Sequence, residues 1–428
     1  MKKTLLAVFT VLAVITAGAG AQDFSFDQLS VNPPQPAAVS GPAAVAPAPV
    51  KAGVQREWLV MVFINGVNDL GILGFADKSV NDMEKVGSTP GMAVVAEYGV
   101  LGQDGSADRN LKFQRGSRTL YITQDADAAN ITSPVIYSSN DADMGSAANL
   151  VRFAKRAIRR YPAKKTAVIL WNHGDGRMGI AYDDVSSNHM EVDQLGRALG
   201  QIKQALGRNI DVFATDACLM QTAEVAYELK DSVDVIVGSE EVIPVDSFPY
   251  DAFLGPLAAN PGVGAEAVGR SIVDTYGAYY TSGGTLSALR SSALGGFVSN
   301  LNTWLGAVAG DPQAFQAAAS PAVVAATYKF PADYYRADSR DLHDYISNVN
   351  GALINSPAAR AAGVALQDYM TNNLIIRATV LPGMLNTHGL AIYLPDLRYN
   401  SANYEKLAFA ADSDWDDFLR LVMEERLK

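Results

Sequence analysis

The sequence predicts an α/β fold in which a mostly parallel sheet is flanked by helices and followed by a mainly helical C-terminal subdomain. Short apolar runs of strand length alternate with amphipathic stretches of helix length between residues 58 and 238, which is the order of a sheet built from strand–helix units. The first run, 58–64, is apolar without interruption, as expected of a strand that is buried on both faces of a parallel sheet. From about Ala288 onward the helical pattern dominates.

The predicted elements follow one another closely along the chain. After the first strand, apolar residues recur from Leu70 to Val86 at helical spacing. Residues 147–161 alternate apolar side chains with arginines and a lysine, which predicts an amphipathic helix with a basic outer face. The other predicted strands are 92–98, 119–123, 166–171, 210–215, 233–238 and a late candidate at 389–394, and the other predicted helices are 194–206 and 219–229.

The N-terminus has the features of a signal peptide. Lys2 and Lys3 precede an apolar run at 5–15 that is too short to span a bilayer comfortably, and Ala19-Gly20-Ala21 fits the small-residue rule for cleavage. We therefore expect a secreted or periplasmic protein whose mature chain has no membrane span. The predicted domains are a signal peptide (1–21), a Pro/Ala-rich linker or pro-segment (22–55), a folded domain (56–287) and a C-terminal subdomain (288–428).

Composition limits the classes of function that need to be considered. The chain has 428 residues, a formal net charge of −11 and a single cysteine. One cysteine excludes an intramolecular disulfide framework, a CxxC redox pair and a cysteine-rich zinc site. The acidic balance argues against a nucleic-acid partner, whose phosphates require clustered Lys and Arg, and it weakly favours cationic partners.

Two predicted strands end in residues that can carry chemistry. The strand ending at Trp171 continues into Asn172-His173-Gly174, and the strand ending at Thr215 continues into Asp216-Ala217-Cys218. Because ligands bind at the carboxyl ends of parallel strands, we expect His173 and Cys218 to face each other across a crevice. An imidazole can accept the proton of a thiol and so activate it as a nucleophile. The N–H groups of Gly174 and Cys218 are candidates for an oxyanion hole, and a helix starting at Leu219 would favour a thiolate.

The motif Asn172-His173-Gly174-x-Gly176, followed 45 residues later by Asp216-Ala217-Cys218-Leu219-Met220, resembles that of the clostripain family of cysteine peptidases. The segments 58–65, 68–70 and 239–251 are also similar to this family. One departure is Asp175, where the family more often has a small residue. The resemblance implies a caspase-like fold, which is shared with caspases, gingipains and legumains.

The resemblance also implies roles for individual residues. Cys218 would be the nucleophile, and His173 would be its base and then the acid that protonates the leaving amine. The pair would act as a dyad without an obligatory third member. Asp216 matches the family aspartate held responsible for a preference for Arg or Lys before the scissile bond, because a carboxylate pairs with a cationic side chain. Asp246 is a second candidate acid of this S1 pocket. An alternative role for Asp216 is to cap the helix that follows it.

The combined expectation is an exported cysteine endopeptidase that hydrolyses peptide bonds after Arg or Lys, in peptide or protein substrates, through a thioester intermediate. Two alternatives stay open: a non-catalytic binding protein on a caspase-like scaffold, and a transpeptidase that uses the same dyad. We expect no cofactor and no metal. Calcium is the one option, through Asp183 and Asp184, but the sequence has no clear calcium-binding motif.

Overall fold

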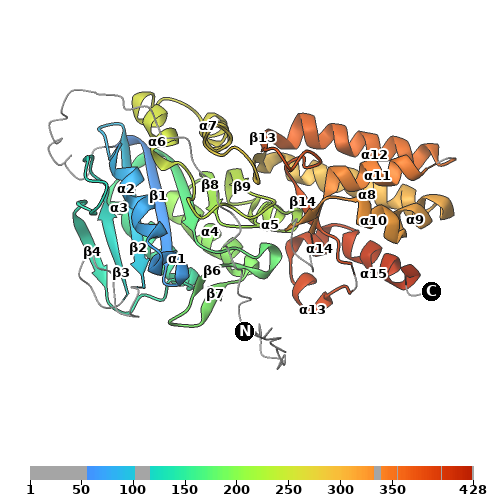
Figure 1. Cartoon of the computed structure of the whole chain (residues 1–428), viewed down its shortest axis with the longest axis horizontal. Coiled ribbons are helices and arrows are strands. Elements are labelled where there is room, and N and C mark those ends of the chain that lie inside the picture. The colour runs from blue at the N-terminus through green and yellow to red at the C-terminus, as the bar shows by residue number, and fades with distance from the viewer. Residues whose placement is uncertain (1–54, 102–115, 332–338, 354, 397, 427–428) are drawn as a thin grey trace, which may run out of the picture. The chain divides into compact units, whose positions relative to one another are not determined.

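The computed structural model describes residues 55–101, 116–331, 339–353, 355–396 and 398–426 (Figure 1). The predicted signal peptide, and all of the predicted linker except its last residue, lie outside the described residues. None of the helices in the described ranges combines the length and the apolar character that a membrane crossing requires.

A nine-stranded mixed sheet forms the centre of the fold, with the strand order β13-β10-β9-β8-β5-β1-β2-β3-β4. Its five central strands, from β9 to β2, are parallel to one another. At each edge two further strands are added, and each of them pairs antiparallel with the strand before it. The strands are β1 (Arg56–Gly66), β2 (Met92–Val100), β3 (Ser117–Tyr121), β4 (Val135–Ser139), β5 (Ala163–Trp171), β8 (Ile210–Asp216), β9 (Val233–Gly238), β10 (Thr285–Arg290) and β13 (Ile375–Val380). The predicted α/β class with a mostly parallel sheet is confirmed.

Helices cover both faces of the sheet, and β1 shows how its residues divide between the two cores. Leu59, Met61 and Phe63 lie in one core with α3, α4 and α5, whereas Trp58 and Val60 lie in the other with α2, α6 and α7. Successive side chains of a strand point to opposite faces, so an uninterrupted apolar run fills both cores. The helices of this part are α1 (Asp69–Ile72), α2 (Phe75–Glu84), α3 (Ala147–Arg160), α4 (Val192–Leu206), α5 (Ala223–Leu229), α6 (Tyr250–Ala259) and α7 (Ala265–Tyr279).

Local sequence signals explain where α4 begins and ends. Glu191 and Gln194 form a capping box, in which each side chain bonds a backbone N–H of the first turn. Gly207 ends the helix with a φ of 71°, a left-handed conformation that glycine adopts without a steric cost. The predicted helix at 194–206 therefore starts two residues earlier, at Val192.

The C-terminal part is mainly helical, as predicted, but it also contributes strands. A short sheet, in the order β11-β12-β14, lies next to the helices, and β13 adds an edge strand to the main sheet. The boundary predicted at residue 288 falls inside β10, so the division into two domains stays a prediction. The elements are α8 (Leu294–Ala309), α9 (Pro312–Ala319), α10 (Pro321–Ala326), α11 (Leu342–Ala352), α12 (Pro357–Tyr369), α13 (Ser401–Tyr404), α14 (Ala408–Asp412), α15 (Trp415–Arg426), β11 (Lys329–Phe330), β12 (Ser339–Asp341) and β14 (Ala391–Tyr393).

A buried pair of acids joins the end of β9 to the C-terminal part. Glu240 is 1% exposed and Asp341 is fully buried. The Oε2 atom of Glu240 accepts the N–H of Gly389 at 2.9 Å, and Asp341 accepts the N–H of Asp344 at 2.7 Å and that of His388 at 2.5 Å. Burial, followed by the neighbouring Asp341 carboxylate, raises the pKa of Glu240 well above its ordinary value. The fold therefore favours the protonated form of Glu240.

The raised pKa of Glu240 makes the stability of the fold depend on pH. The folded-state pKa of Glu240 lies above its unfolded value, so its contribution to stability is complete below the unfolded pKa and is lost as the pH rises toward the folded value. In Glu240→Gln, the amide donates to Asp341 and its oxygen accepts the Gly389 N–H at any pH. We expect the Tm of the wild type to fall more steeply than that of the variant between pH 5 and pH 8, as measured by thermal melting.

The exposed Glu424 on α15 provides the matched control. Glu424→Gln should leave the pH dependence of the Tm unchanged. Parallel Tm curves for the wild type and Glu240→Gln would contradict the raised pKa of Glu240.

Candidate active site

The register of β5 on β8 brings the two predicted reactive segments together. Trp171, the last residue of β5, is paired with Asp216, the last residue of β8. The segments that follow, with His173 and Cys218, therefore leave the sheet at the same edge. At Gly174 a Cβ atom would lie 2.4 Å from the carbonyl oxygen of Cys218, closer than packed atoms approach. Only glycine lets the two backbones come this close.

A carboxylate that the sequence analysis did not assign contacts the histidine. The Nε2 atom of His173 lies 2.7 Å from Oδ1 of Asp69. The hydrogen bond from His173 is the main cause that lowers the pKa of Asp69, so this residue is an ionised acceptor at neutral pH. A carboxylate acceptor selects the tautomer with hydrogen on Nε2, which leaves Nδ1 as the basic nitrogen of the neutral ring. Asp69 could have been found from the sequence, because it lies in segment 68–70, which resembles the clostripain family.

Asparagine side chains hold the backbone around this pair. Asn65, at the end of β1, and Asn68, the N-cap of α1, both donate to the carbonyl oxygen of Tyr182 at 3.0 Å. Asn172 accepts the N–H of Tyr182 at 2.6 Å and donates to the carbonyl oxygen of Asn65 at 2.5 Å. These bonds tie the ends of β1 and β5 to the hairpin of β6 (Ile180–Asp183) and β7 (Asn188–Met190), and so fix the loops that carry Asp69 and His173.

The residue Cys218 is partly exposed, but the surroundings of its thiol group disfavour the negatively charged thiolate form. The Sγ atom is 4.0 Å from the carbonyl oxygen of Ile243. Burial, with the nearby carboxylates of Glu241 and Asp216, raises the pKa of Cys218 to about 12. The resting protein therefore carries a protonated thiol.

The predicted helix start after the cysteine is wrong. Leu219 has a φ of 64° and its N–H bonds the carbonyl oxygen of Glu241 at 3.2 Å, so the chain is irregular here. Helix α5 begins at Ala223 with Thr222 as its N-cap. Because the field of a helix terminus falls off within one turn, α5 does not stabilise a thiolate at Cys218. Because Thr222 is the N-cap of α5, the alternative role of Asp216 as the N-cap of this helix is excluded.

Asp216 is a buried hydrogen-bond acceptor at the end of β8. Three donors reach its Oδ2 atom: the hydroxyl of Ser247, the N–H of Phe248 at 3.1 Å and the hydroxyl of Tyr250 at 2.9 Å. Burial raises the pKa of Asp216 to about 6 in spite of these donors. The carboxylate is therefore ionised at neutral pH and becomes neutral in mild acid.

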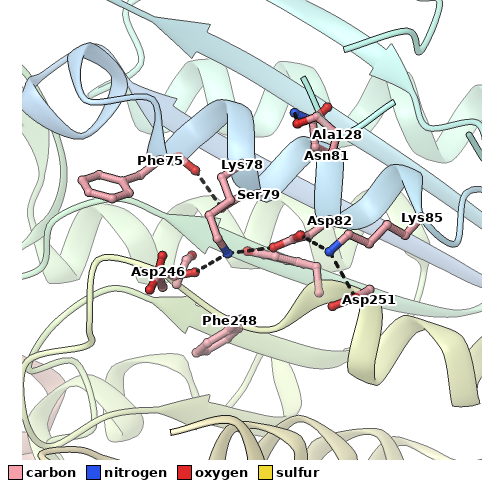
Figure 2. A network of polar contacts seen from close by, with 12 residues as sticks. Phe75, Lys78, Ser79, Asn81, Asp82, Lys85, Ala128, Asp246, Phe248 and Asp251 are labelled. Carbon is pink, nitrogen blue, oxygen red and sulfur yellow. Dashed lines mark hydrogen bonds and ion pairs between the residues drawn. The ribbon is translucent and has the colours of Figure 1, made fainter. Parts of the chain in front are cut away.

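Asp246 lies one residue before Ser247 on the loop between β9 and α6. It is partly buried, and its carbonyl oxygen accepts the ammonium group of Lys78 at 3.3 Å (Figure 2). The two predicted pocket acids are thus connected through adjacent residues of one loop.

The C-terminal part contributes to the surroundings of the thiol. Leu219, Phe330 and Ala391 form a small apolar cluster against which Cys218 and Tyr328 are packed. Phe330 belongs to β11 and Ala391 to β14, so residues distant in sequence form one wall beside the cysteine.

No group of three or more metal-ligating side chains is present among the residues described. The carboxylate of Asp183 accepts the backbone N–H groups of Met144, Val185 and Ser186 at 2.9–3.0 Å, and so acts as a turn-stabilising acceptor. Calcium binding through Asp183 and Asp184 stays an untested option.

Comparison with known proteins assigns the chain to a family. A model of the clostripain family matches residues 62–421. The chain belongs to the clostripain family. It is 31% identical to clostripain of Hathewaya histolytica over 188 residues, which covers 39% of this chain and 34% of that protein. The match thus spans about a third of the curated relative.

Solved structures of the clostripain family share the fold. A secreted C11 cysteine protease from Bacteroides thetaiotaomicron, in complex with an irreversible peptide inhibitor, has a TM-score of 0.61 at 19% identity and covers 84% of this chain and 99% of that one. An inactive zymogen C11 protease from Parabacteroides distasonis has a TM-score of 0.62 at 20% identity and covers 84% of this chain and 98% of that one. These similarities bear out the predicted fold class.

The raised pKa of the Cys218 thiol in this clostripain-family protein can be tested by measuring its rate of alkylation at different pH values. Cys218 is the single cysteine, so the rate of reaction with iodoacetamide reports on it alone. Because the thiolate is the reacting species, a pKa of about 12 predicts slow alkylation at pH 7 and a rate that rises about tenfold per pH unit up to pH 10. Mass spectrometry of the intact protein measures this rate.

His173→Ala should follow the same pH profile if the thiol is protonated at rest. A fast rate that is constant from pH 6 to pH 9 in the wild type, and lost in His173→Ala, would instead indicate a standing thiolate–imidazolium pair.

Proposed function

We propose that the protein is an exported cysteine endopeptidase that hydrolyses peptide bonds after Arg or Lys, with Cys218 as nucleophile and His173 as general base. The observation that carries the proposal is the β5–β8 register, which brings the loop of His173 to the backbone of Cys218 at one sheet edge. Membership of the clostripain family supports the reaction class. The signal-peptide features of residues 1–21 support export.

In the proposed first step, His173 accepts the thiol proton as Sγ attacks the scissile carbonyl. A protonated resting thiol requires this transfer to accompany attack. As the S–C bond forms, the carbonyl electrons move to oxygen, and the N–H groups of Gly174 and Cys218 bind the oxyanion. The neighbouring N–H groups have backbone partners: that of Asp175 bonds the carbonyl oxygen of Gly179, and that of Leu219 bonds the carbonyl oxygen of Glu241.

His173 then donates its proton to the nitrogen of the leaving group as the C–N bond breaks. The product is a thioester between Cys218 and the acyl part of the substrate, and a free amine departs. Water attacks the thioester carbonyl, and His173 accepts a proton from it. As the C–S bond breaks, His173 returns this proton to the sulfur, which regenerates the thiol and releases a carboxylic acid.

Asp69 extends the proposed dyad by orienting the imidazole. Its carboxylate accepts Nε2–H, which leaves Nδ1 as the nitrogen that accepts the thiol proton and which stabilises the positive charge that develops on the ring. Asp69 is therefore a positioning residue in the proposal.

Asp216 is the proposed determinant of specificity for Arg or Lys. The three donors that bond its carboxylate, two hydroxyls and one backbone N–H, all bind Oδ2, so Oδ1 is the oxygen proposed to bind a substrate cation. A buried carboxylate gains from pairing with such a cation and gains nothing from a neutral side chain. Asp246 is the second proposed acid of this pocket.

A panel of fluorogenic peptides ending in Arg, Lys, Asp or Ala tests the proposal. We expect cleavage after Arg and Lys only, and none by Cys218→Ala. Asp216→Asn keeps an acceptor for the loop donors but removes the charge, so kcat/KM for the basic peptides should fall about 100-fold, equivalent to about 2.7 kcal/mol. Cleavage only after Asp or Ala would refute the acidic pocket.

The panel also separates the alternatives. Folded protein that binds the peptides but cleaves none would favour the non-catalytic binding protein. Addition of an acceptor peptide with a free amino group, followed by mass spectrometry, distinguishes ligation by a transpeptidase from hydrolysis.

Substitution of Asp69 tests its proposed positioning role. Asp69→Asn retains an acceptor for Nε2–H without the charge, and Asp69→Leu removes both, so kcat should fall about 10-fold and about 100-fold respectively while KM stays within about twofold. Steady-state kinetics with the Arg peptide measure both constants.

Asp175→Asn is the matched control, because this acid is exposed on the loop after His173. It should retain wild-type kcat. Equal activity of Asp69→Leu and wild type would show that the dyad functions without Asp69.

A further inference from the structure

A lysine from helix α2 reaches the loop that carries the proposed pocket acids. The Nζ atom of Lys78 is 2.9 Å from Oδ2 of Asp82 and 3.3 Å from the carbonyl oxygen of Asp246. Figure 2 shows the side chain crossing from α2 to this loop. The ammonium group also lies 6.0 Å from the ring centre of Tyr279. Lys78 thus connects α2 to the segment between β9 and α6.

The loop it contacts has a conformation that needs external support. Ser247 has a φ of 71°, in a left-handed region that residues other than glycine occupy at an energetic cost. Its neighbours supply that support: the indole N–H of Trp171 donates to the Ser247 hydroxyl at 2.6 Å, and the Tyr280 hydroxyl donates to the Ser247 carbonyl oxygen at 2.5 Å. Lys78 holds the preceding residue, Asp246.

The same turn determines where the charge of Asp216 lies. The hydroxyl of Ser247 and the N–H of Phe248 both donate to Oδ2 of this carboxylate. A shift of the backbone at Asp246 would therefore move one pocket acid directly and weaken the bonds that orient the other.

The charge of Lys78 is maintained by its surroundings. Burial acts against the ammonium form, but Asp82, with contributions from Tyr279 and Asp246, outweighs it and raises the pKa of Lys78. A charged donor therefore faces the loop throughout the neutral pH range.

We propose that Lys78 is a positioning residue for substrate specificity, whose ammonium group anchors the Asp246 carbonyl and thereby keeps both pocket acids in place for the cationic side chain of the substrate. The inference rests on the proposed cleavage after Arg or Lys. By this proposal, helix α2, which lies outside the segments of His173 and Cys218, contributes to the choice of substrate.

The test compares steady-state kinetics of Lys78→Met and Lys78→Arg on the Arg and Lys peptides. Lys78→Met keeps the length of the side chain but cannot donate, so KM should rise about tenfold with kcat within about twofold of the wild type. Lys78→Arg retains charge and donors, and should restore KM to within about threefold. The alkylation rate of Cys218, which needs no cationic substrate, should be unchanged in both variants.

Lys85 is the matched control, because it also pairs with Asp82 and also reaches a neighbouring element. Its Nζ atom lies 2.6 Å from Oδ1 of Asp82 and 3.3 Å from Oδ2 of Asp251 on α6. Lys85→Met should leave KM unchanged, although it removes a pair from the same network (Figure 2).

The outcomes separate this inference from the proposed function. Wild type that cleaves the basic peptides, together with an unchanged or lower KM in Lys78→Met, overturns the anchoring role alone. A lower KM would show that Lys78 competes with the substrate cation. An equal rise in KM for Lys85→Met would attribute the effect to the fold of α2. Wild type that cleaves neither basic peptide overturns the proposed specificity and this inference with it.

Discussion

The parallel pairing of β5 with β8 is the constraint on which the rest of the site depends. Both strands are buried between two layers of helices, and their last residues, Trp171 and Asp216, lie opposite each other. A shift of one residue would exchange the two faces of a strand and place its apolar side chains in the wrong core. The hydrophobic cores therefore fix the register, and the register fixes where the loops of His173 and Cys218 leave the sheet.

Hydrogen bonds from buried polar side chains then fix the irregular segments beyond the strand ends. The Asn172 side chain bonds the loop that returns to Tyr182, and Asp216 bonds the loop that contains Ser247. Left-handed residues other than glycine occur in or beside these segments, at Ala181 in β6, at Leu219 after β8 and at Ser247. Such conformations persist where surrounding contacts determine them, and here those contacts come from the ends of the central strands.

The C-terminal part is integrated with the sheet by both apolar and polar contacts. Phe330 and Ala391 pack beside Cys218 and Leu219, while the carboxyl groups of Glu240 and Asp341 lie together in the interior. Such a buried pair tolerates little displacement, because a separated carboxylate would lose its partner in a medium of low dielectric constant. The packing thus couples the position of the helical part to that of the reactive segment.

The order of the central elements and the two segments that meet at the sheet edge could be predicted from the sequence. Apolar runs such as 58–64 and motifs such as Asn172-His173-Gly174 are local patterns, and local patterns are visible without a fold. The edge strand β13 was not predicted, because a half-exposed strand lacks the uninterrupted apolar run of a central one. The start of α5 was misplaced, because a bond from Leu219 to Glu241 interrupts an otherwise helical pattern. Three features became visible only in the folded protein: the contact of Asp69 with His173, the raised pKa of the Cys218 thiol and the contact of Lys78 with the Asp246 loop. Each of these depends on burial or on contact between segments far apart in sequence, and neither quantity is encoded at a single position.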